Sequence, residues 1–415
     1  MNHQIFPSND SAALRQGESG VLSLALMDAR NQTLALLSAF EASLGEALNQ
    51  GTPPSGFNPP LWTMSHLAWF QEYWIARNLQ RQRGPGADPA ATRLVSVVPQ
   101  ADLLWRVPPV VQMGANRQAP SDPAQVRAYL LATLETTLEL LDKTANDDDA
   151  LYFYRLALFH EDRQGEALVQ LAQMLGVSWP GPLPAAQVMR PTMWLPASHW
   201  QLGRSAGQGG FSVDNEQPSY SVAVPEFEID AQLVTWAQYV EFVQDGGYDR
   251  ADLWQPQGWQ WLQTQAQGEG RRCPRYVEQM GASSGAVTQT LFGKAMRMQS
   301  TQPVMHVSWW EADAWCRWAG RRLPAEVEWD LAAHTASRRG FAWGEALEWT
   351  GTTFRGYPGF QAGLWREYSE PSFGTHKALR GASFATRPRL RDTAMRYFLQ
   401  PERDDAFTGF RSCAL

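Results

Sequence analysis

The sequence is poor in cysteine and has no long run of apolar residues. Its three cysteines, Cys273, Cys316 and Cys413, lie far apart and form no C-x-x-C pair. An odd, scattered set argues against a disulfide scaffold and a cysteine-based metal site, and it favours a reducing cytoplasm. No apolar stretch approaches the length that crosses a bilayer, and the first ten residues lack the basic start and apolar run of a signal peptide. We therefore expect a cytoplasmic protein with no membrane partner.

Basic residues are not in excess either. The 415-residue chain has 35 Lys and Arg against 42 Asp and Glu, a net charge of -7, and its basic residues are scattered. A nucleic-acid partner is therefore not expected. The length is enough for at least two domains, and 44% hydrophobic residues can fill their cores. The 19 tryptophans indicate many aromatic contacts, in the fold or in a substrate cleft.

The first 178 residues have the pattern of a four-helix bundle. Apolar residues recur at helical spacing in four segments, at about 20–48, 59–82, 121–144 and a last one after residue 149 that ends near Gly176. The polar residues up to about Gly17 are expected to be loose. Residues 83–120 form a long connection, with a short extended piece near 95–98, and such connections are often functional.

Two histidines fall on the apolar, aromatic helices of this bundle. His160 and Gln164 are four residues apart, so their side chains lie on one helix face, and His66 lies in the second helix. Inward histidines from two helices can begin a metal site near one end of a bundle. The spacing alone leaves a second interpretation open, in which these are hydrogen-bonded core histidines. Gln164 weakens the metal interpretation, because a neutral amide is a poor ligand.

The character of the sequence changes after a Pro-rich linker at 179–192. Residues 193–415 are rich in Gly, Trp, Arg and short β-like runs, typical of an irregular α+β domain with much loop. Helices are expected from Thr235 to about Gln244, from Trp309 to Ala319 and from Pro324 onward. The Gly-rich run at 203–210 has no following Lys-Ser/Thr, so it does not predict a phosphate loop.

Several sequence strings resemble known families. The N-terminal half resembles a DinB-like four-helix bundle. The C-terminal half resembles the formylglycine-generating-enzyme (sulfatase-modifying factor) fold, which is C-type-lectin-like, and the expected class is α+β. The strings that carry the second resemblance lie at 210–216, 303–312, 320–329, 379–386 and 407–411.

The combination of both halves resembles the ergothioneine-synthase (sulfoxide synthase) family and its relative, selenoneine synthase. This resemblance implies an Fe(II) enzyme that uses O₂ to join sulfur from a thiol, or selenium from a selenosugar, to the imidazole C2 of hercynine. The family holds iron with one histidine in a W-x-x-x-H string and two in H-E-x-x-H-x-E. Trp62 with His66, and His160 with Glu161, match these strings, but Gln164 stands at the third histidine. Either Gln164 or water completes the site, or the metal has been lost.

The resemblance also implies residues for the substrates. Tyr368, Arg396 and Arg403 match positions of the ergothioneine enzymes that use γ-glutamylcysteine. The Arg-Asn-Trp-Asp string of those enzymes reads Arg-Tyr-Phe-Leu at 396–399 here, so its Asp is absent. Trp365 occupies the position of the tyrosine that serves those enzymes in oxygen chemistry. The resemblance thus implies two sets of site residues: Tyr368 and Trp365 as catalytic residues, and Tyr397, Phe398, Arg396, Arg380 and Arg403 as substrate-binding residues. An aromatic pocket without that Asp suits a trimethylammonium group and a neutral sugar, so we predict the selenosugar as second substrate.

Other functions remain as alternatives. One is ordinary ergothioneine synthesis with cysteine or another thiol, and another is a metal-free binding protein descended from such an enzyme. A formylglycine-generating oxidase is rejected, because that chemistry needs a close cysteine pair near the C-terminus and only Cys413 lies there. The remaining histidines have no spaced partner, and a structural or surface role is expected for His199, His306, His334 and His376.

Overall fold

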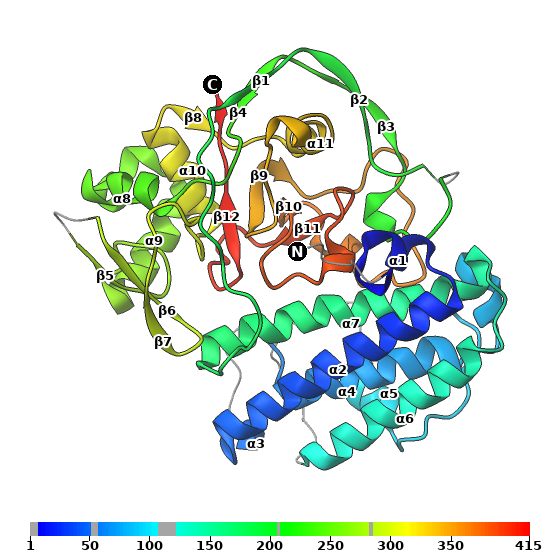
Figure 1. Cartoon of the computed structure of the whole chain (residues 1–415). Helices are drawn as coiled ribbons and strands as arrows, with labels where there is room; N and C mark the ends of the chain where they lie inside the picture. Colours follow the sequence, from blue (N-terminus) through cyan, green and yellow to red (C-terminus); the bar gives the residue numbers. More distant parts are fainter. Residues whose placement is uncertain (1–6, 51–56, 107–121, 206–207, 282–284) are drawn as a thin grey trace.

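The computed structural model describes residues 7–50, 57–106, 122–205, 208–281 and 285–415. A helical part and a mixed α/β part lie against each other, with α7 between them (Figure 1). The helices of the first part are α1 (Ser11–Gln16), α2 (Ser19–Leu44), α3 (Ala47–Gln50), α4 (Pro60–Gln71), α5 (Ala101–Trp105), α6 (Pro123–Leu141) and α7 (Asp148–Leu175). Helices α2, α4, α6 and α7 pack on one another as the expected bundle.

The boundaries of α7 follow from its sequence. The Asp147 side chain accepts a hydrogen bond from the Ala150 amide as N-cap, and two more aspartates occupy the first turn, where the helix dipole favours negative charge. At the other end, Gly176 adopts the left-handed conformation (φ 68°, ψ 21°) that glycine tolerates best. The 28-residue helix therefore begins at Asp148, so His160 lies near its middle. These bounds agree with the helix expected after residue 149 and ending near Gly176.

The second part contains four small sheets. Their strand orders are β1-β4-β13-β8, β11-β10-β9-β12, β2-β3 and β5-β6-β7. Its strands are β1 (Met193–Leu195), β2 (Ser198–Leu202), β3 (Tyr220–Val224), β4 (Phe227–Ile229), β5 (Val277–Met280), β6 (Val287–Leu291), β7 (Lys294–Arg297), β8 (Arg321–Arg322), β9 (Leu347–Thr353), β10 (Lys377–Gly381), β11 (Tyr397–Leu399), β12 (Thr408–Phe410) and β13 (Cys413–Ala414). Its helices are α8 (Trp236–Gln244), α9 (Pro256–Glu269), α10 (Trp309–Trp318) and α11 (Glu326–Thr335). Only β12 and β9 pair in parallel among these strands of the described residues.

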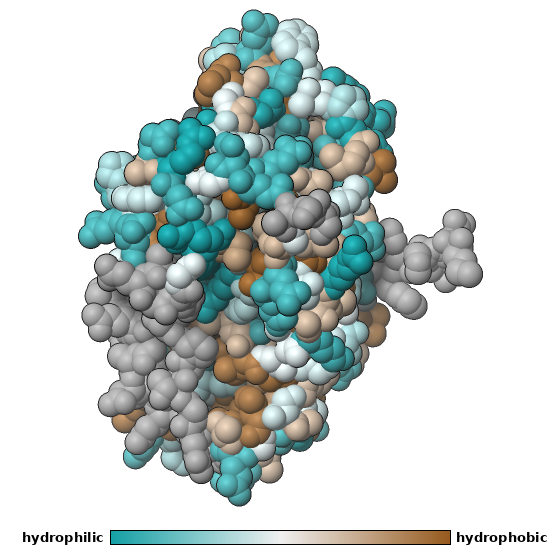
Figure 2. All heavy atoms as spheres, turned by 90° about the vertical axis from the view of Figure 1, so that its left-hand side faces the viewer, coloured by the Kyte–Doolittle hydropathy of each residue, from teal (hydrophilic) through white to brown (hydrophobic). Residues whose placement is uncertain are grey.

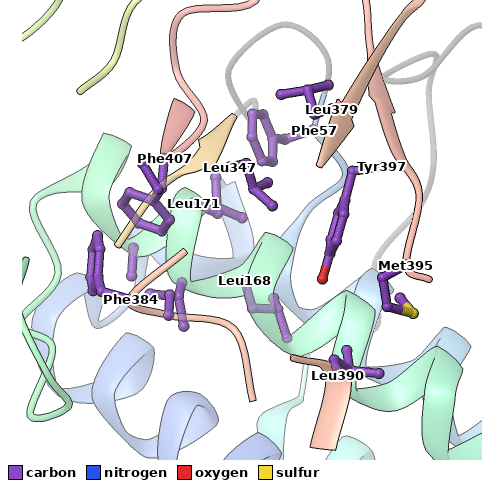
Figure 3. Close-up of a cluster of buried hydrophobic side chains, with 14 of the residues drawn as sticks. Phe57, Leu168, Leu171, Leu347, Leu379, Phe384, Leu390, Met395, Tyr397 and Phe407 are labelled. Atoms are coloured by element: carbon purple, nitrogen blue, oxygen red, sulfur yellow. The ribbon is translucent and has the colours of Figure 1, made fainter. Parts of the chain in front are cut away.

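The two parts share one buried hydrophobic core. Leu168 and Leu171 of α7 point into a cluster with Phe384, Tyr397 and Phe407 of the second part (Figure 3). Where the backbones meet at the end of α7, a Cβ on Gly293 would stand 2.7 Å from the Gly176 carbonyl oxygen. Only glycine permits such an approach. A common core and this close contact fix α7 against the second part.

Polar contacts also join the two parts. The Arg389 guanidinium donates to both carboxylate oxygens of Asp162 at 2.5 and 2.8 Å. The hydroxyls of Ser383 and Thr386 donate to Glu166 Oε1 at 2.6 and 2.9 Å. These partners are buried. Side chains along one face of α7 are therefore held by residues more than 200 positions away in the sequence.

The structure corrects several expectations for the helical part. Residues before Gly17 are not loose where described, because Asp10 caps α1 and the buried Arg15 pairs with Glu216. The second helix ends at Gln71 and continues as a π-helical turn, Glu72–Ala76, rather than as α-helix to Gln82. The extended piece at 95–98 joins no sheet; instead the Val97 amide donates to Glu72. Part of the long connection, residues 107–120, lies outside the described residues.

The surface seen in Figure 2 is largely hydrophilic in its upper half, and hydrophobic side chains form smaller patches lower down. Among the described helices, none is long and apolar enough to span a bilayer. All three cysteines are free thiols. Arg321 and Arg322 form structural ion pairs: Arg322 pairs with Glu328 at 2.7 Å and Arg321 with Asp230 at 3.2 Å.

Candidate active site

His66 is held in one orientation by the bundle. Its helix α4 is buried on every side, and the imidazole is 6% exposed. Nδ1 lies 2.8 Å from the Trp105 carbonyl oxygen, which can only accept, so Nδ1 carries the proton. Trp62 stacks on the ring with centroids 5.1 Å apart. In the neutral ring the lone pair is then on Nε2, the tautomer that metal-binding histidines use when their other nitrogen is anchored to a carbonyl.

His160 of α7 meets His66 edge to face. Their ring centroids are 5.1 Å apart at an interplanar angle of 66°. Phe70 stacks on the face of the His160 ring at 3.8 Å, and the buried Nε2 of His160 has no hydrogen-bond partner. Burial, with a smaller contribution from nearby His66, lowers the pKa of His160 well below 6.5, so the ring is neutral. The predicted pairing of the two histidines is therefore present in the structure.

A loop of the second part covers this pair. Trp365 lies edge-on to His160, with centroids 5.1 Å apart, and stacks on Tyr368 at 4.6 Å. Asp214 holds the loop, because its carboxylate accepts from the Ser369 hydroxyl at 2.5 Å and the Gly363 amide at 3.3 Å. Trp365 and Tyr368 are partly exposed, so solvent reaches the edge of an otherwise buried site. The two predicted catalytic residues thus lie beside the histidine pair.

The acidic residues near His160 are engaged elsewhere. Glu161 accepts two hydrogen bonds from Arg30 at 2.8 and 3.0 Å and one from Thr33, which joins α7 to α2. Among the residues that the structure describes, no three His, Cys, Asp or Glu side chains gather as a metal-binding group. Gln164 lies one turn after His160 and is partly exposed. The histidine pair therefore offers two imidazole nitrogens, with a glutamine amide next along the same helix face.

The structure separates two of the predicted substrate-binding arginines from the histidine pair. Arg396 donates to both oxygens of buried Glu326 at 2.6 and 3.0 Å. Arg380 is fully buried and contacts Glu326 and Asp330. These guanidiniums hold β10 and β11 to α11 and have few donors left for a ligand. Arg403 is partly exposed and donates to Asp405 at 2.6 Å.

The predicted aromatic residues Tyr397 and Phe398 lie on β11, between the site and the core. Phe398 meets the edge of Tyr368, with centroids 5.5 Å apart. Tyr397 is 1% exposed, and burial raises the pKa of its hydroxyl. The Arg163 guanidinium lies over the Tyr397 ring at 4.1 Å. Sequence reasoning missed Arg163 and Asp214 as site residues. The signal for Arg163 was its place three residues after His160, on the same side of the helix.

Comparison with known families defines the class of this chain. Residues 25–172 match the DinB superfamily, and residues 182–348 match the sulfatase-modifying factor enzyme 1-like domain. The chain therefore joins a helical DinB domain to a sulfatase-modifying-factor domain, as the resemblance predicts. Both histidines of the candidate site lie within the first matched range, and Trp365 and Tyr368 follow the end of the second.

Relatives over nearly the whole chain are hercynine oxygenases. The one from Mycolicibacterium smegmatis is 28% identical, with 92% of this chain and 96% of the relative covered. That of Mycobacterium tuberculosis is also 28% identical, covering 85% and 90%. The formylglycine-generating enzyme of Streptomyces coelicolor is 32% identical but covers only 40% of this chain and 55% of its own length. The chain is thus a homologue of the hercynine oxygenases, with both domains included.

Proposed function

We propose that this chain is a hercynine-dependent, O₂-using enzyme that joins sulfur, or selenium, to the imidazole C2 of hercynine. The observation that carries the proposal is the pair of buried imidazoles, with ring centroids 5.1 Å apart, beneath Trp365 and Tyr368 of the second domain. The similarity to hercynine oxygenases along both domains supports the substrate.

The residues present fit an iron ion. The His160 Nε2 is buried without a hydrogen-bond partner. Because an unpaired buried nitrogen costs free energy, a metal ion bound to it would stabilise this arrangement. His66, His160 and the amide oxygen of Gln164 would hold Fe(II) from one side. Bound there, the metal would supply O₂ activation and a coordination position for the sulfur or selenium atom.

The chain's own side chains bind and orient the substrates. The faces of Trp365 and Tyr368 are suited to a trimethylammonium group by cation–π attraction. Burial raises the pKa of Tyr368, so its hydroxyl stays protonated at neutral pH and can donate a hydrogen bond to the substrate. Trp365 has no phenolic proton to give. Tyr368 is therefore our candidate for the group that positions or protonates the substrate.

The identity of the second substrate divides the proposal. The hercynine-oxygenase relatives favour a thiol and sulfur, as in ergothioneine synthesis. The selenosugar remains as a second candidate, because Arg380 and Arg396 are committed to Glu326 and Asp330 and leave little positive charge for an anionic thiol peptide. A neutral donor needs no such charge.

The proposal is tested by supplying hercynine and O₂ to the Fe(II)-loaded protein, with cysteine, γ-glutamylcysteine or a selenosugar, and detecting products by mass spectrometry. A C2–sulfur product supports the thiol reaction, and a C2–selenium product without a sulfur product supports the selenosugar reaction. Formation of neither product contradicts the proposed activity. A metal-free binding protein remains if hercynine still binds.

A formylglycine-generating reaction is not supported. Burial raises the pKa of both Cys316 and Cys413, so neither is poised as a reactive thiolate. The third cysteine, Cys273, also has a raised pKa for the same reason. The match to formylglycine-generating enzymes therefore reflects the domain, and the chemistry is assigned to the histidine pair.

Gln164 offers a direct test of the metal ligands. We expect Gln164→Glu to tighten Fe(II) binding by about 10-fold or more, because a carboxylate beside two histidines neutralises part of the ion's charge. Anaerobic titration against a chromophoric chelator measures the affinity. Gln170→Glu adds the same charge to a partly exposed site on α7, further from His160, and serves as the matched control. Equal affinities in both variants would remove Gln164 from the ligand set.

A further inference from the structure

A second group of reactive side chains lies on α11, outside the histidine pair. His334 is in the last turn of this helix, and its Nδ1 lies 2.8 Å from the Asp330 carbonyl oxygen. A carbonyl oxygen can only accept, so Nδ1 carries the proton and, in the neutral ring, the lone pair is on Nε2. That nitrogen lies 3.0 Å from the Thr393 hydroxyl, which therefore donates to it. A hydroxyl that donates to an imidazole has the arrangement of a nucleophile with its general base.

The Asp330 carboxylate lies on the other side of the imidazole. Its Oδ2 is 3.6 Å from His334 Nδ1 and accepts a hydrogen bond from Trp200 Nε1 at 2.6 Å. The Asp330 side chain is 5% exposed, whereas that of His334 is 42% exposed. A buried negative charge at this distance stabilises the imidazolium that forms when the ring takes up a proton. Asp330 thus orients the ring through its carbonyl oxygen and stabilises it through its carboxylate.

A buried cation fixes the backbone at Thr393. Arg380 Nη2 donates to the Thr393 carbonyl oxygen at 2.6 Å, and the same guanidinium pairs with Asp330. Arg380 is 1% exposed, so this connection belongs to the core of the domain. The distance between the Thr393 hydroxyl and the His334 ring is therefore set by buried contacts, as a catalytic arrangement requires.

These side chains line a pocket between β2 and α11, which pack on each other (Figure 1). Its volume is about 360 Å³, enough for a small organic molecule. The Trp200 ring forms part of the wall, with its centroid 5.3 Å from that of His334. Arg204 also lines the pocket, and its guanidinium lies 3.5 Å from a backbone oxygen. A cation there can stabilise the negative charge that develops on an acyl oxygen.

We propose that this pocket is a second catalytic site, which hydrolyses small acyl esters through Thr393. The Thr393 hydroxyl oxygen bonds to the acyl carbon while His334 Nε2 takes the hydroxyl proton. The bond between the acyl carbon and the ester oxygen then breaks, and His334 returns the proton to the leaving alcohol. Water releases the acyl group from Thr393 by the same two steps. Atoms and electrons balance without a further reactant, so this activity goes beyond the proposed hercynine reaction and does not depend on it.

The test follows release of p-nitrophenolate from p-nitrophenyl acetate, with the Fe(II)-loaded protein and with the same protein after chelation. Both forms are expected to hydrolyse the ester at the same rate. Thr393→Ala and His334→Gln are each expected to lower that rate by about 100-fold, as for loss of a general base or of the nucleophile that it serves. Thr393→Ser keeps the hydroxyl, and its rate is expected to stay within about 10-fold of wild type.

Acid quenching during turnover locates the acyl group. Trypsin cleaves after Arg391 and Arg396, so Thr393 falls in the peptide 392–396, which holds no other hydroxyl or amine side chain. Mass spectrometry is expected to find an acetyl group on this peptide in wild-type protein and in Thr393→Ser. The peptide from His334→Gln is expected to stay unmodified.

Thr375 provides the matched control. Its hydroxyl lies 2.9 Å from His376 Nδ1, but it also donates to the Ser372 carbonyl oxygen at 3.2 Å, which removes the activation. Thr375→Ala is therefore expected to hydrolyse the ester as wild type does. Equal rates in wild type and a folded Thr393→Ala protein overturn the proposal, and so does acetylation of other peptides alone. If Thr393→Ala does not fold, the wild-type peptide decides. None of these outcomes affects the hercynine reaction.

Discussion

Replacing His160 by alanine is expected to lower kcat for the proposed reaction by at least about 10³-fold, equivalent to about 4 kcal/mol of transition-state stabilisation. The imidazole Nε2 is buried without a hydrogen-bond partner, lies next to His66 and has no nearby substitute nitrogen of the same kind among the described residues. The same variant is expected to retain little Fe(II) after gel filtration. Product yield by mass spectrometry and iron content by atomic absorption measure the two effects.

A change at this position also leaves a cavity beneath Phe70, which stacks on the ring at 3.8 Å. His160→Gln fills part of that space, and it should show an unfolding midpoint closer to wild type while remaining inactive. His199→Ala is the matched control, because His199 is exposed on β2 and outside the site. Substantial activity in a folded His160→Ala protein would show that the chemistry lies elsewhere.

The sequence predicted the histidine pair because both residues lie on strongly periodic, apolar helices. Helical spacing is a local property, and only one packing of four amphipathic helices brings His66 and His160 face to face. The helices expected at Thr235 and Trp309 are also confirmed, because capping boxes at Thr235 and Ser308 mark their starts.

The partners of the arginines could not be predicted in this way. Arg396 and Arg380 belong to motifs that suggested substrate binding, yet both pair with Glu326, some 50 to 70 positions earlier in the chain. Conversely, Arg163 looked like one more polar position on a helix. Its guanidinium lies over the Tyr397 ring at 4.1 Å and pairs with Glu166 at 3.3 Å, and the contact with Tyr397 becomes visible only when β11 has been placed against α7.

The start of α7 is a second feature that the sequence alone did not predict. The acidic run at 146–149 looks like the end of the preceding helix, whereas Asp147 caps the next one and the following aspartates occupy its first turn. Aspartate favours both turns and helix N-termini, so local composition does not decide whether this run ends one helix or begins the next. The contact of Asp148 with Arg155 and with the Gly210 amide of the second domain supports the helical choice.

The second large effect concerns stability. Arg389→Met is expected to lower the free energy of unfolding by about 3–5 kcal/mol, because it leaves the buried carboxylate of Asp162 without its bidentate partner. Chemical denaturation followed by circular dichroism measures the change. Since Asp162 lies two residues after His160, the variant is also expected to lose activity below its unfolding transition.

The pH dependence of the free energy of unfolding shows whether the loss in Arg389→Met comes from the charge of Asp162. Burial already raises the pKa of Asp162 above 3.8, although Arg389 opposes this, and removing the arginine raises it further. A group whose pKa is raised in the folded state loses its contribution to stability as the pH rises through that value. The deficit of Arg389→Met relative to wild type should therefore grow from pH 5 to pH 8. A deficit independent of pH would assign the loss to packing of the methionine.

A neighbouring arginine supplies the comparison. Arg387 contacts the same Asp28 that Arg389 reaches, but Asp28 is 42% exposed and Arg387 21% exposed. Because water solvates both charges, Arg387→Met is expected to cost less than about 1 kcal/mol. A large effect at Arg389 with a small one at Arg387 would show that the buried pair with Asp162 holds the second domain on α7. The position of Trp365 and Tyr368 over the histidines depends on that same contact surface, so stability and catalysis should fall together.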